Sequence, residues 1–287
     1  MRALLLAGLL LAGCSGPAPR YVVGEPYRMG GVWSYPREDF SLTETGLATR
    51  QAGPGWNATT ANGEAWSGSR ALAAHRTLQL PAVVTVTNLE NGRSLTLRVN
   101  DRGPVNPGRV IGLSDRAADL LGVPAGAATQ VRLAVDGDRS RALSDAVPGR
   151  EVPRVAIETA PRAAVAAESL EPPPGARSSG SVAPVATRVA AEEAPAARPR
   201  DVALPETVSQ GSPQPGRLYV ELGTLSRPDS AQRLAARVPG ARIETIGTRR
   251  DRQYRVRLGP YPDVTGADAA LERSLSAGVS GARILVD

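Results

Sequence analysis

The sequence contains a single cysteine, a single histidine, few aromatic residues and no lysine. One cysteine, Cys14, excludes an intrachain disulfide. Aromatic residues make up only 3% of the 287 residues, so any core has to consist mainly of Val, Leu, Ile and Ala. Hydrophobic residues reach 41%, which is enough for globular cores in about two domains. Every basic residue is an arginine, and arginine favours bidentate contacts to carboxylates and phosphates.

The net charge of +6 is modest and is not concentrated in one tract. Charge alone therefore indicates a nucleic-acid partner only weakly, because the same sign also suits a polyanionic cell envelope. We expect no nucleic-acid partner, no metal and no cofactor.

The N-terminus has the three parts of an export signal. Met1 and Arg2 supply a positive start, and residues 3–12 form an apolar run that is too short to span a bilayer as a helix. Leu-Ala-Gly then precedes Cys14, which resembles a bacterial lipoprotein signal. Residues 1–13 are then a signal peptide, and Cys14 carries the lipid that anchors the chain to a membrane. The alternative is an ordinary buried cysteine in a short hydrophobic N-terminus.

Composition divides the remaining chain into four segments. Residues 14–40 are rich in Gly, Pro and Tyr and predict an extended spacer with little regular structure. Residues 41–137 predict a compact β domain. Residues 138–215 are dominated by Ala, Pro, Arg, Glu, Ser and Val without a sustained period, which predicts a long disordered linker. Residues 216–287 recover a regular pattern. The fold class is therefore mainly β plus α+β.

The β domain contains one clear hairpin. The β-branched run 83–88 and the run 94–99 flank Asn91-Gly92, a turn signal. Residues 114–121 predict a helix that Ser114 caps and Gly122 ends, and residues 129–135 predict a last strand. Residues 69–77 predict a short helix or turn. Several short strands with one or two short helices indicate a small barrel.

The C-terminal domain has the order βαββαβ. The expected strands cover 217–222, 241–246, 253–258 and 282–286, and the expected helices cover 230–238 and 267–277. The strand at 253–258 alternates Tyr254, Val256 and Leu258 with two arginines, as a half-buried strand does. This order is that of a split-βαβ sandwich.

Three residues of the β domain carry chemistry that suits general acid/base catalysis. Glu64 ends the stretch Thr-Ala-Asn-Gly-Glu, His75 is the only histidine, and Asp101 lies in Val-Asn-Asp-Arg-Gly-Pro. Two carboxylates and an imidazole in one small domain are sufficient for such chemistry. Each also has a structural alternative: Asp101 could close a turn, Glu64 could be a solvated loop charge, and His75 could bind a backbone group.

These motifs, together with Thr-Asn-Leu-Glu-Asn-Gly-Arg-Ser at 87–94, resemble the rare lipoprotein A family. The resemblance implies a double-psi β-barrel like the catalytic domains of some lytic transglycosylases. Residues 219–223 and 254–261 are similar to the sporulation-related (SPOR) repeat, which binds peptidoglycan glycan strands. The resemblance implies Tyr219 and Tyr254 as glycan-binding residues, although one of them could belong to the core.

Carried over by motif, the family's functional residues fall on Asp101, Glu64 and His75. The resemblance implies that Asp101 is the acid/base, with Glu64 as its electrostatic partner or the alternative acid. His75 would orient a carboxylate or the sugar. Asn62 and Arg102 are expected to bind substrate, or Arg102 simply holds its loop.

Within the β domain, the sequence departs from the family pattern at three places. Residues 49–52 read Thr-Arg-Gln-Ala where the family usually has Ser-Trp-Tyr-Gly, so aromatic sugar platforms are missing. Trp56 or Trp66 could replace them or pack in the core. Gly112 stands where an Asp is frequent, and Ser67 stands where an Asp commonly follows the motif glutamate.

Two functions from different classes follow from these motifs. The first is an endolytic lytic transglycosylase that cleaves glycan strands to 1,6-anhydro products during wall remodelling and daughter-cell separation. The second is a noncatalytic lipoprotein scaffold that bridges the outer membrane and the septal wall. Both place the protein in the cell envelope, lipid-anchored and enriched at the septum, with peptidoglycan strands and septal ring proteins as expected partners.

Overall fold

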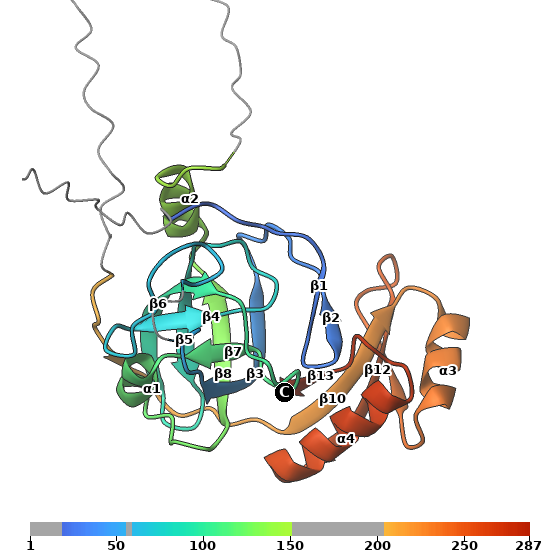
Figure 1. Cartoon of the computed structure of the whole chain (residues 1–287). Coiled ribbons are helices and arrows are strands. Elements are labelled where there is room, and N and C mark those ends of the chain that lie inside the picture. Colours follow the sequence, from blue (N-terminus) through green and yellow to red (C-terminus); the bar gives the residue numbers. More distant parts are fainter. Residues whose placement is uncertain (1–18, 56–58, 151–203) are drawn as a thin grey trace, which may run out of the picture. The chain divides into compact units, whose positions relative to one another are not determined.

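The computed structural model describes residues 19–55, 59–150 and 204–287 (Figure 1). Cys14, Trp56 and most of the expected linker lie outside these residues. No helix in the described ranges is both long and apolar enough to cross a membrane.

Six strands of the N-terminal domain close into a barrel in the order β4-β7-β3-β8-β5-β6, with β6 pairing again to β4. The pairs β3–β7 and β4–β6 are parallel, and the other pairs are antiparallel. This confirms the double-psi β-barrel that the motifs predicted. The strands are β3 (Thr43–Arg50), β4 (Leu72–Ala74), β5 (Ala82–Asn88), β6 (Arg93–Asp101), β7 (Ile111–Leu113) and β8 (Thr129–Val135).

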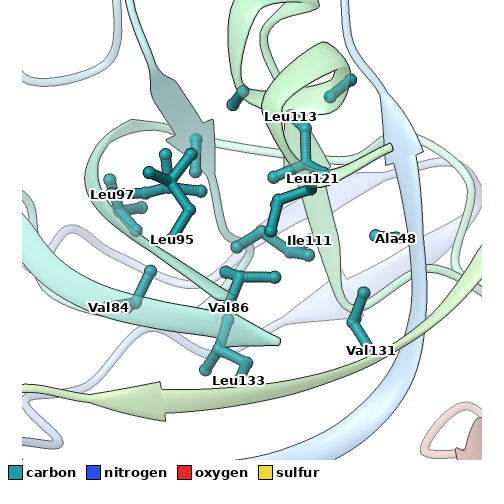
Figure 2. Close-up of a cluster of buried hydrophobic side chains, with 14 of the residues drawn as sticks. Ala48, Val84, Val86, Leu95, Leu97, Ile111, Leu113, Leu121, Val131 and Leu133 are labelled. Atoms are coloured by element: carbon teal, nitrogen blue, oxygen red, sulfur yellow. The ribbon is translucent and has the colours of Figure 1, made fainter. Parts of the chain in front are cut away.

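Aliphatic side chains fill the interior of the barrel, as the low aromatic content requires. Successive strands contribute alternate residues, since side chains on a strand point to opposite faces. Figure 2 shows these side chains converging from strands that are distant in sequence. Fully or nearly fully buried examples are Val84, Val86, Leu95, Leu97, Ile111, Leu113, Val131 and Leu133.

The local signals of the sequence are confirmed in this domain. β5 and β6 form the hairpin, and Gly92 has a φ of 79° at the turn. Helix α1 (Asp115–Leu121) begins after Ser114, whose side chain accepts a hydrogen bond from the backbone N–H of Ala117. Gly122 ends it in the left-handed conformation. The prediction of a helix or turn at residues 69–77 is wrong, because β4 occupies the middle of that stretch.

Two segments expected to be irregular contain regular structure. The spacer forms a hairpin of β1 (Tyr27–Met29) and β2 (Val32–Ser34). The linker was expected to begin at residue 138, but helix α2 (Gly137–Asp145) lies there. Near the other end of the linker, β9 (Ser209–Gln210) pairs with the start of β6. Both ends of residues 138–215 are therefore ordered against the barrel.

The C-terminal domain has the predicted βαββαβ order. Its strands form one antiparallel sheet in the order β11-β12-β10-β13, and apolar residues of α3 and α4 pack on it. Apolar residues of the sheet such as Val220, Val256 and Ile284 are buried with Ala231, Ala267 and Leu271 of the helices. The elements are β10 (Leu218–Leu225), α3 (Pro228–Arg237), β11 (Arg242–Ile246), β12 (Gln253–Tyr261), α4 (Val264–Ser276) and β13 (Arg283–Val286).

Candidate active site

The Thr-Ala-Asn-Gly-Glu motif forms a tight turn that closes on itself. The backbone N–H of Thr60 donates to the carbonyl of Glu64 at 2.8 Å, and Gly63 N–H donates to the carbonyl of Thr60 at 2.8 Å. The Asn62 side chain is fully buried inside the turn, where its Oδ1 accepts from the Thr60 hydroxyl at 2.8 Å. Asn62 is thus a structural element of the turn as well as a neighbour of the carboxylate of Glu64.

The Glu64 carboxylate is buried, with 6% of the residue exposed, and three side chains donate to it. Asn62 Nδ2 and Arg98 Nη2 donate to Oε1, the former at 2.7 Å, and Asn100 Nδ2 donates to Oε2 at 3.1 Å. Arg98 is itself only 5% exposed, so this is a buried ion pair. A buried carboxylate with a cation and two amide donors is held in one orientation, and Arg98 balances its charge.

Asp101 lies at the end of β6, where the parallel pairing with β4 is irregular. Ala73 pairs with Val99, but Ala74 pairs with Asp101, so one residue of β6 is extra. Such a bulge re-aims the side chains beside it. The Asp101 carboxylate is partly buried and its Oδ1 accepts from the backbone N–H of Ala61, in the motif turn, at 2.9 Å.

Burial raises the pKa of the Asp101 carboxyl above its ordinary value, because loss of solvent disfavours the charged form. Hydrogen bonds from the backbone of Ala61 and Arg102 and the charge of Arg102 oppose this shift without cancelling it. A carboxyl group with a raised pKa retains its proton to a higher pH, as a general acid requires.

The side chain of His75 points to a different carboxylate. Its Nε2 lies 3.0 Å from Glu44 Oε1, while its Nδ1 accepts from the backbone N–H groups of Thr77 at 3.2 Å and Leu78 at 3.1 Å. Since Nδ1 is the acceptor, the proton of the neutral ring is on Nε2 and is donated to Glu44. His75 touches Asp101 only through the backbone, where its N–H donates to the Asp101 carbonyl at 3.0 Å.

Glu44 is therefore a member of this constellation that the sequence alone did not indicate. Burial pushes the pKa of Glu44 up, but the hydrogen bond from His75 together with nearby positive charge outweighs it, so the pKa lies below the ordinary value. The pair holds the loop that follows β4 against β3.

Arg102 donates to backbone carbonyls on two segments. Its Nη1 donates to Leu78 O at 2.5 Å and reaches His75 O at 3.4 Å, and its Nη2 donates to Val23 O. The guanidinium therefore ties the loop after β4 to the N-terminal segment. Of the two roles considered for Arg102, these contacts support the holding of the loop.

The barrel thus brings Glu64 and Asp101 together through one turn, and it places His75 beside them through the backbone. Arg98 and Asn100 complete the site, and sequence reasoning did not single them out. The alternation of side chains along β6 could have indicated them. Leu95, Leu97 and Val99 face the core, so residues 98 and 100 share the opposite face. A buried arginine on that face requires an acid partner, and Glu64 supplies it.

The two expected glycan-binding tyrosines of the C-terminal domain lie in different environments. Tyr254 is partly buried and packs against the apolar cluster, like its neighbour Val256. Tyr219 follows the buried Leu218 and precedes the buried Val220, so it points to the other face of the sheet, where Arg257 lies over its ring at 4.1 Å. Of the two rings, only that of Tyr219 thus lies on the face of the sheet opposite α3 and α4, which we call the open face.

Among the described residues, no group of three or more His, Cys, Asp or Glu side chains is arranged to hold a metal ion. The site as described consists of two carboxylates, one buried cation and two amide side chains. Such a set can transfer a proton and stabilise developing positive charge.

Sequence comparison places both domains in known families. A profile of the family described as "Lytic transglycolase" matches residues 50–133, which hold most of the barrel and the site apart from Glu44. A profile of the SPOR domain matches residues 214–284.

The chain is also similar to curated proteins from several bacteria. It is 33% identical over 249 residues to a protein of Pseudomonas aeruginosa named "Endolytic peptidoglycan transglycosylase RlpA", covering 83% of this chain and 70% of that protein. Proteins with the same name from Vibrio cholerae and Rickettsia bellii are 36% identical over 161 residues and 43% identical over 104 residues. These two matches cover 46% and 35% of this chain, and 61% and 46% of the relatives.

Proposed function

Because this chain belongs to the RlpA family of endolytic peptidoglycan transglycosylases, we propose that it cleaves peptidoglycan glycan strands internally, between N-acetylmuramic acid and N-acetylglucosamine, with Asp101 as the acid/base. One observation supports this assignment above all others. Asp101 is a partly buried carboxyl group with a raised pKa, and the turn that donates a backbone hydrogen bond to it also carries Glu64, a buried carboxylate paired with a cation.

The reaction requires one proton donor that later accepts a proton. Asp101 gives its proton to the glycosidic oxygen as the bond from the anomeric carbon to that oxygen breaks. The 6-hydroxyl of the muramic acid then attacks the anomeric carbon, and its proton returns to the Asp101 carboxylate. The product is a 1,6-anhydro end and no water is consumed, so the scheme differs from glycoside hydrolysis in its nucleophile alone.

Glu64 supports this cycle through its charge. Three donors face its two oxygens, so it is suited to accept hydrogen bonds and poorly suited to donate a proton. The oxygens of this oriented ion pair are assigned to stabilise an oxocarbenium-like transition state. Asn62 belongs to the same network and is assigned to hold Glu64.

His75 is assigned as a positioning residue. Its ring bonds to Glu44 and to the backbone of residues 77 and 78, and its own N–H bonds to the carbonyl of Asp101. It therefore orders the loop on which the end of β6 rests, and it acts on the reaction through Asp101.

The remaining parts of the proposal concern where the enzyme acts. The C-terminal domain binds glycan strands from which the stem peptides have been removed, with Tyr219 on its open face. Lipid on Cys14 anchors the chain to the membrane, in the outer membrane facing the periplasm. Together these two attachments bring the barrel to the septal wall, near division proteins, during daughter-cell separation. Their support is the Leu-Ala-Gly-Cys motif and the SPOR match.

The test is digestion of purified, amidase-treated sacculi with the wild-type protein and two carboxylate variants, with products analysed by mass spectrometry. Wild type should release anhydro-ended fragments from within strands. Asp101→Asn keeps the size and the acceptor for Ala61, and it should reduce the rate about 10²–10⁴-fold because proton transfer is lost. Glu64→Gln should reduce the rate less.

The double variant Glu64→Gln/Asp101→Asn should be no slower than Asp101→Asn, since both groups serve one step. Full activity of a folded Asp101→Asn protein would move the acid elsewhere. A wild-type protein that binds sacculi but yields no anhydro ends would instead indicate the noncatalytic scaffold.

A further inference from the structure

Gln51 lies next to the Asp101 loop, in the stretch 49–52 where the sequence departs from the family pattern. It follows directly on β3, and its backbone N–H donates to the carbonyl of Leu113 in β7 at 2.8 Å. Its side chain extends toward the loop after β6, where Nε2 donates to the carbonyl of Arg102 at 3.3 Å. The amide therefore bonds to the residue immediately after Asp101.

Two glycines make room for this amide. A Cβ on Gly112 would overlap Oε1 of Gln51 and would lie 2.9 Å from its Cβ and 3.0 Å from its Cδ. A Cβ on Gly103 would lie 2.7 Å from Nε2 and 2.8 Å from Cδ. Real Cβ atoms essentially never approach other atoms so closely, so any side chain at either position would displace the amide. Gly103 also has a φ of 150°, a conformation that favours glycine.

The amide also contains an unusual atom. Oε1 of Gln51 is buried and has no hydrogen-bond partner within the described part of the chain. Leaving a buried acceptor without a donor costs free energy, so a position that packing alone decided would favour an apolar side chain of similar size. A polar side chain at this position is explained by the hydrogen bond that Nε2 of the amide donates to the carbonyl of Arg102.

We propose that Gln51 is a positioning residue for the acid/base, holding the backbone of residues 102 and 103 and thereby the Asp101 carboxyl in its partly buried place. This inference rests on the proposed role of Asp101. Without the amide, the space between the two glycines is polar and open to water, since the Arg102 carbonyl then needs a donor. Water there would hydrate the Asp101 loop and loosen it.

Three variants of the full-length protein test this. Gln51→Ala removes the amide. Gly112→Ala leaves the amide in the chain but takes its place, so it should produce the same defect. Gln51→Gly/Gly112→Ala relieves the overlap without restoring the amide, and it should be no worse than either single change, because all three remove one interaction.

For each variant we expect kcat for anhydro-product release to fall by roughly 10- to 100-fold with little change in KM, the effect of a misplaced catalytic group. The basic limb of the pH–rate profile should move to lower pH, because a hydrated Asp101 loses its proton more readily. If Gln51 only supported the fold, its substitution would lower the amount of folded enzyme and leave the basic limb of the pH–rate profile unchanged.

A second readout is independent of activity. Titration of the Asp101 carboxyl by ¹³C NMR should give a lower pKa in Gln51→Ala and in Gly112→Ala than in the wild type. An unchanged Asp101 titration and pH profile in the folded variants would overturn the role of Gln51 and leave the proposed function intact. If wild type released no anhydro products, the proposed function would fail, while the NMR titration would still decide whether Gln51 positions Asp101.

Discussion

At the scale of single residues, the site shows a conflict between stability and chemistry at Asp101. The carboxyl group is held where loss of solvent raises its pKa, while its neighbour Glu64 has a cation and two amides to itself. Holding an acid in such surroundings weakens the folded state, and functional sites commonly contain such costs. The two carboxylates therefore have different environments and different proposed roles.

A consequence can be measured as stability against pH. A carboxyl group whose pKa is raised in the folded state contributes its stability below the pKa of the unfolded chain and loses it as the pH rises through the folded value. Asp101→Asn carries no such penalty, so its melting temperature should exceed that of the wild type at neutral pH. The difference should shrink as the pH falls toward the ordinary range of an aspartate. Thermal scans from about pH 3 to about pH 8 would show it, because this range covers both the ordinary pKa of an aspartate and a raised one. A variant less stable than wild type by the same amount at every pH would contradict this expectation.

His75 should behave differently from the two carboxylates. His75→Ala removes the acceptor of two backbone N–H groups and leaves Glu44 without its donor, so it should cost about 1–3 kcal/mol of unfolding free energy. His75→Asn retains a short acceptor and should recover part of that loss. Urea unfolding of both variants gives the comparison. An alanine variant as stable as wild type but inactive would assign His75 to the chemistry itself.

At the scale of elements, helix α2 is a part of the barrel and not of the linker. Ser140 is fully buried, and its hydroxyl accepts from the N–H of Val83 at 2.9 Å and donates to the carbonyl of Val83 at 3.1 Å. Ser144 donates to the carbonyl of Pro81 at 3.4 Å. The helix thus provides hydrogen-bond partners at the end of β5 where the sheet does not.

Ser140→Ala should therefore destabilise the barrel by about 1–3 kcal/mol, because the backbone N–H of Val83 loses its partner in a buried place. The carbonyl of Val83 still accepts from the backbone N–H of Asp136 at 2.9 Å. Exposed Ser212 offers a matched control, since its change to alanine should leave unfolding unaffected. Chemical denaturation of the two variants gives the measurement. An unchanged denaturation midpoint for Ser140→Ala would indicate that α2 does not stabilise the barrel.

The elements that sequence reasoning recovered are those with local signals. The β5–β6 hairpin has a turn dipeptide between two alternating runs, and α1 has a capping serine and a terminal glycine. The strand β4 has only three residues, and its partners are β6 and β7, distant in sequence. Helix α2 shares the composition of the linker, and only its buried contacts separate it. Pairing and burial of this kind depend on the whole fold.

The same limit applies to the site. Glu64, His75 and Asp101 were found because their motifs are recognisable. Glu44 lies in β3 outside any motif, and Gln51 follows β3 in the stretch 49–52 that departs from the family pattern. Their roles arise from strands that meet only in the closed barrel. The sequence therefore predicted the identity of the acid candidates but not the residues that orient them.

At the scale of the whole molecule, the proposal requires two attachments and one catalytic domain in a single chain. The C-terminal domain can contribute only if its open face recognises glycan. Arg257 on that face lies over the ring of Tyr219, and it is also paired with Asp287 at 2.6 Å and Glu244 at 3.1 Å. Two carboxylates therefore neutralise this arginine, and the Tyr219 ring is the better candidate for contact with a sugar.

Tyr219→Ala in the full-length protein should consequently weaken sedimentation with amidase-treated sacculi, while Tyr254→Phe should bind as wild type does, because that ring packs against the core and keeps its apolar contacts.

Stacking of a ring on an aromatic face depends little on ionic strength, whereas attraction of free arginines to an anionic wall is screened within about 8–10 Å at moderate salt. Binding that survives added salt in the wild type but is lost in Tyr219→Ala would support recognition through the ring. Binding that disappears with salt and is indifferent to Tyr219 would instead assign the contact to the other arginines of the domain. Sedimentation at two salt concentrations, with the anhydro-product assay run on the same samples, separates loss of targeting from loss of catalysis, since Tyr219→Ala leaves the barrel unchanged.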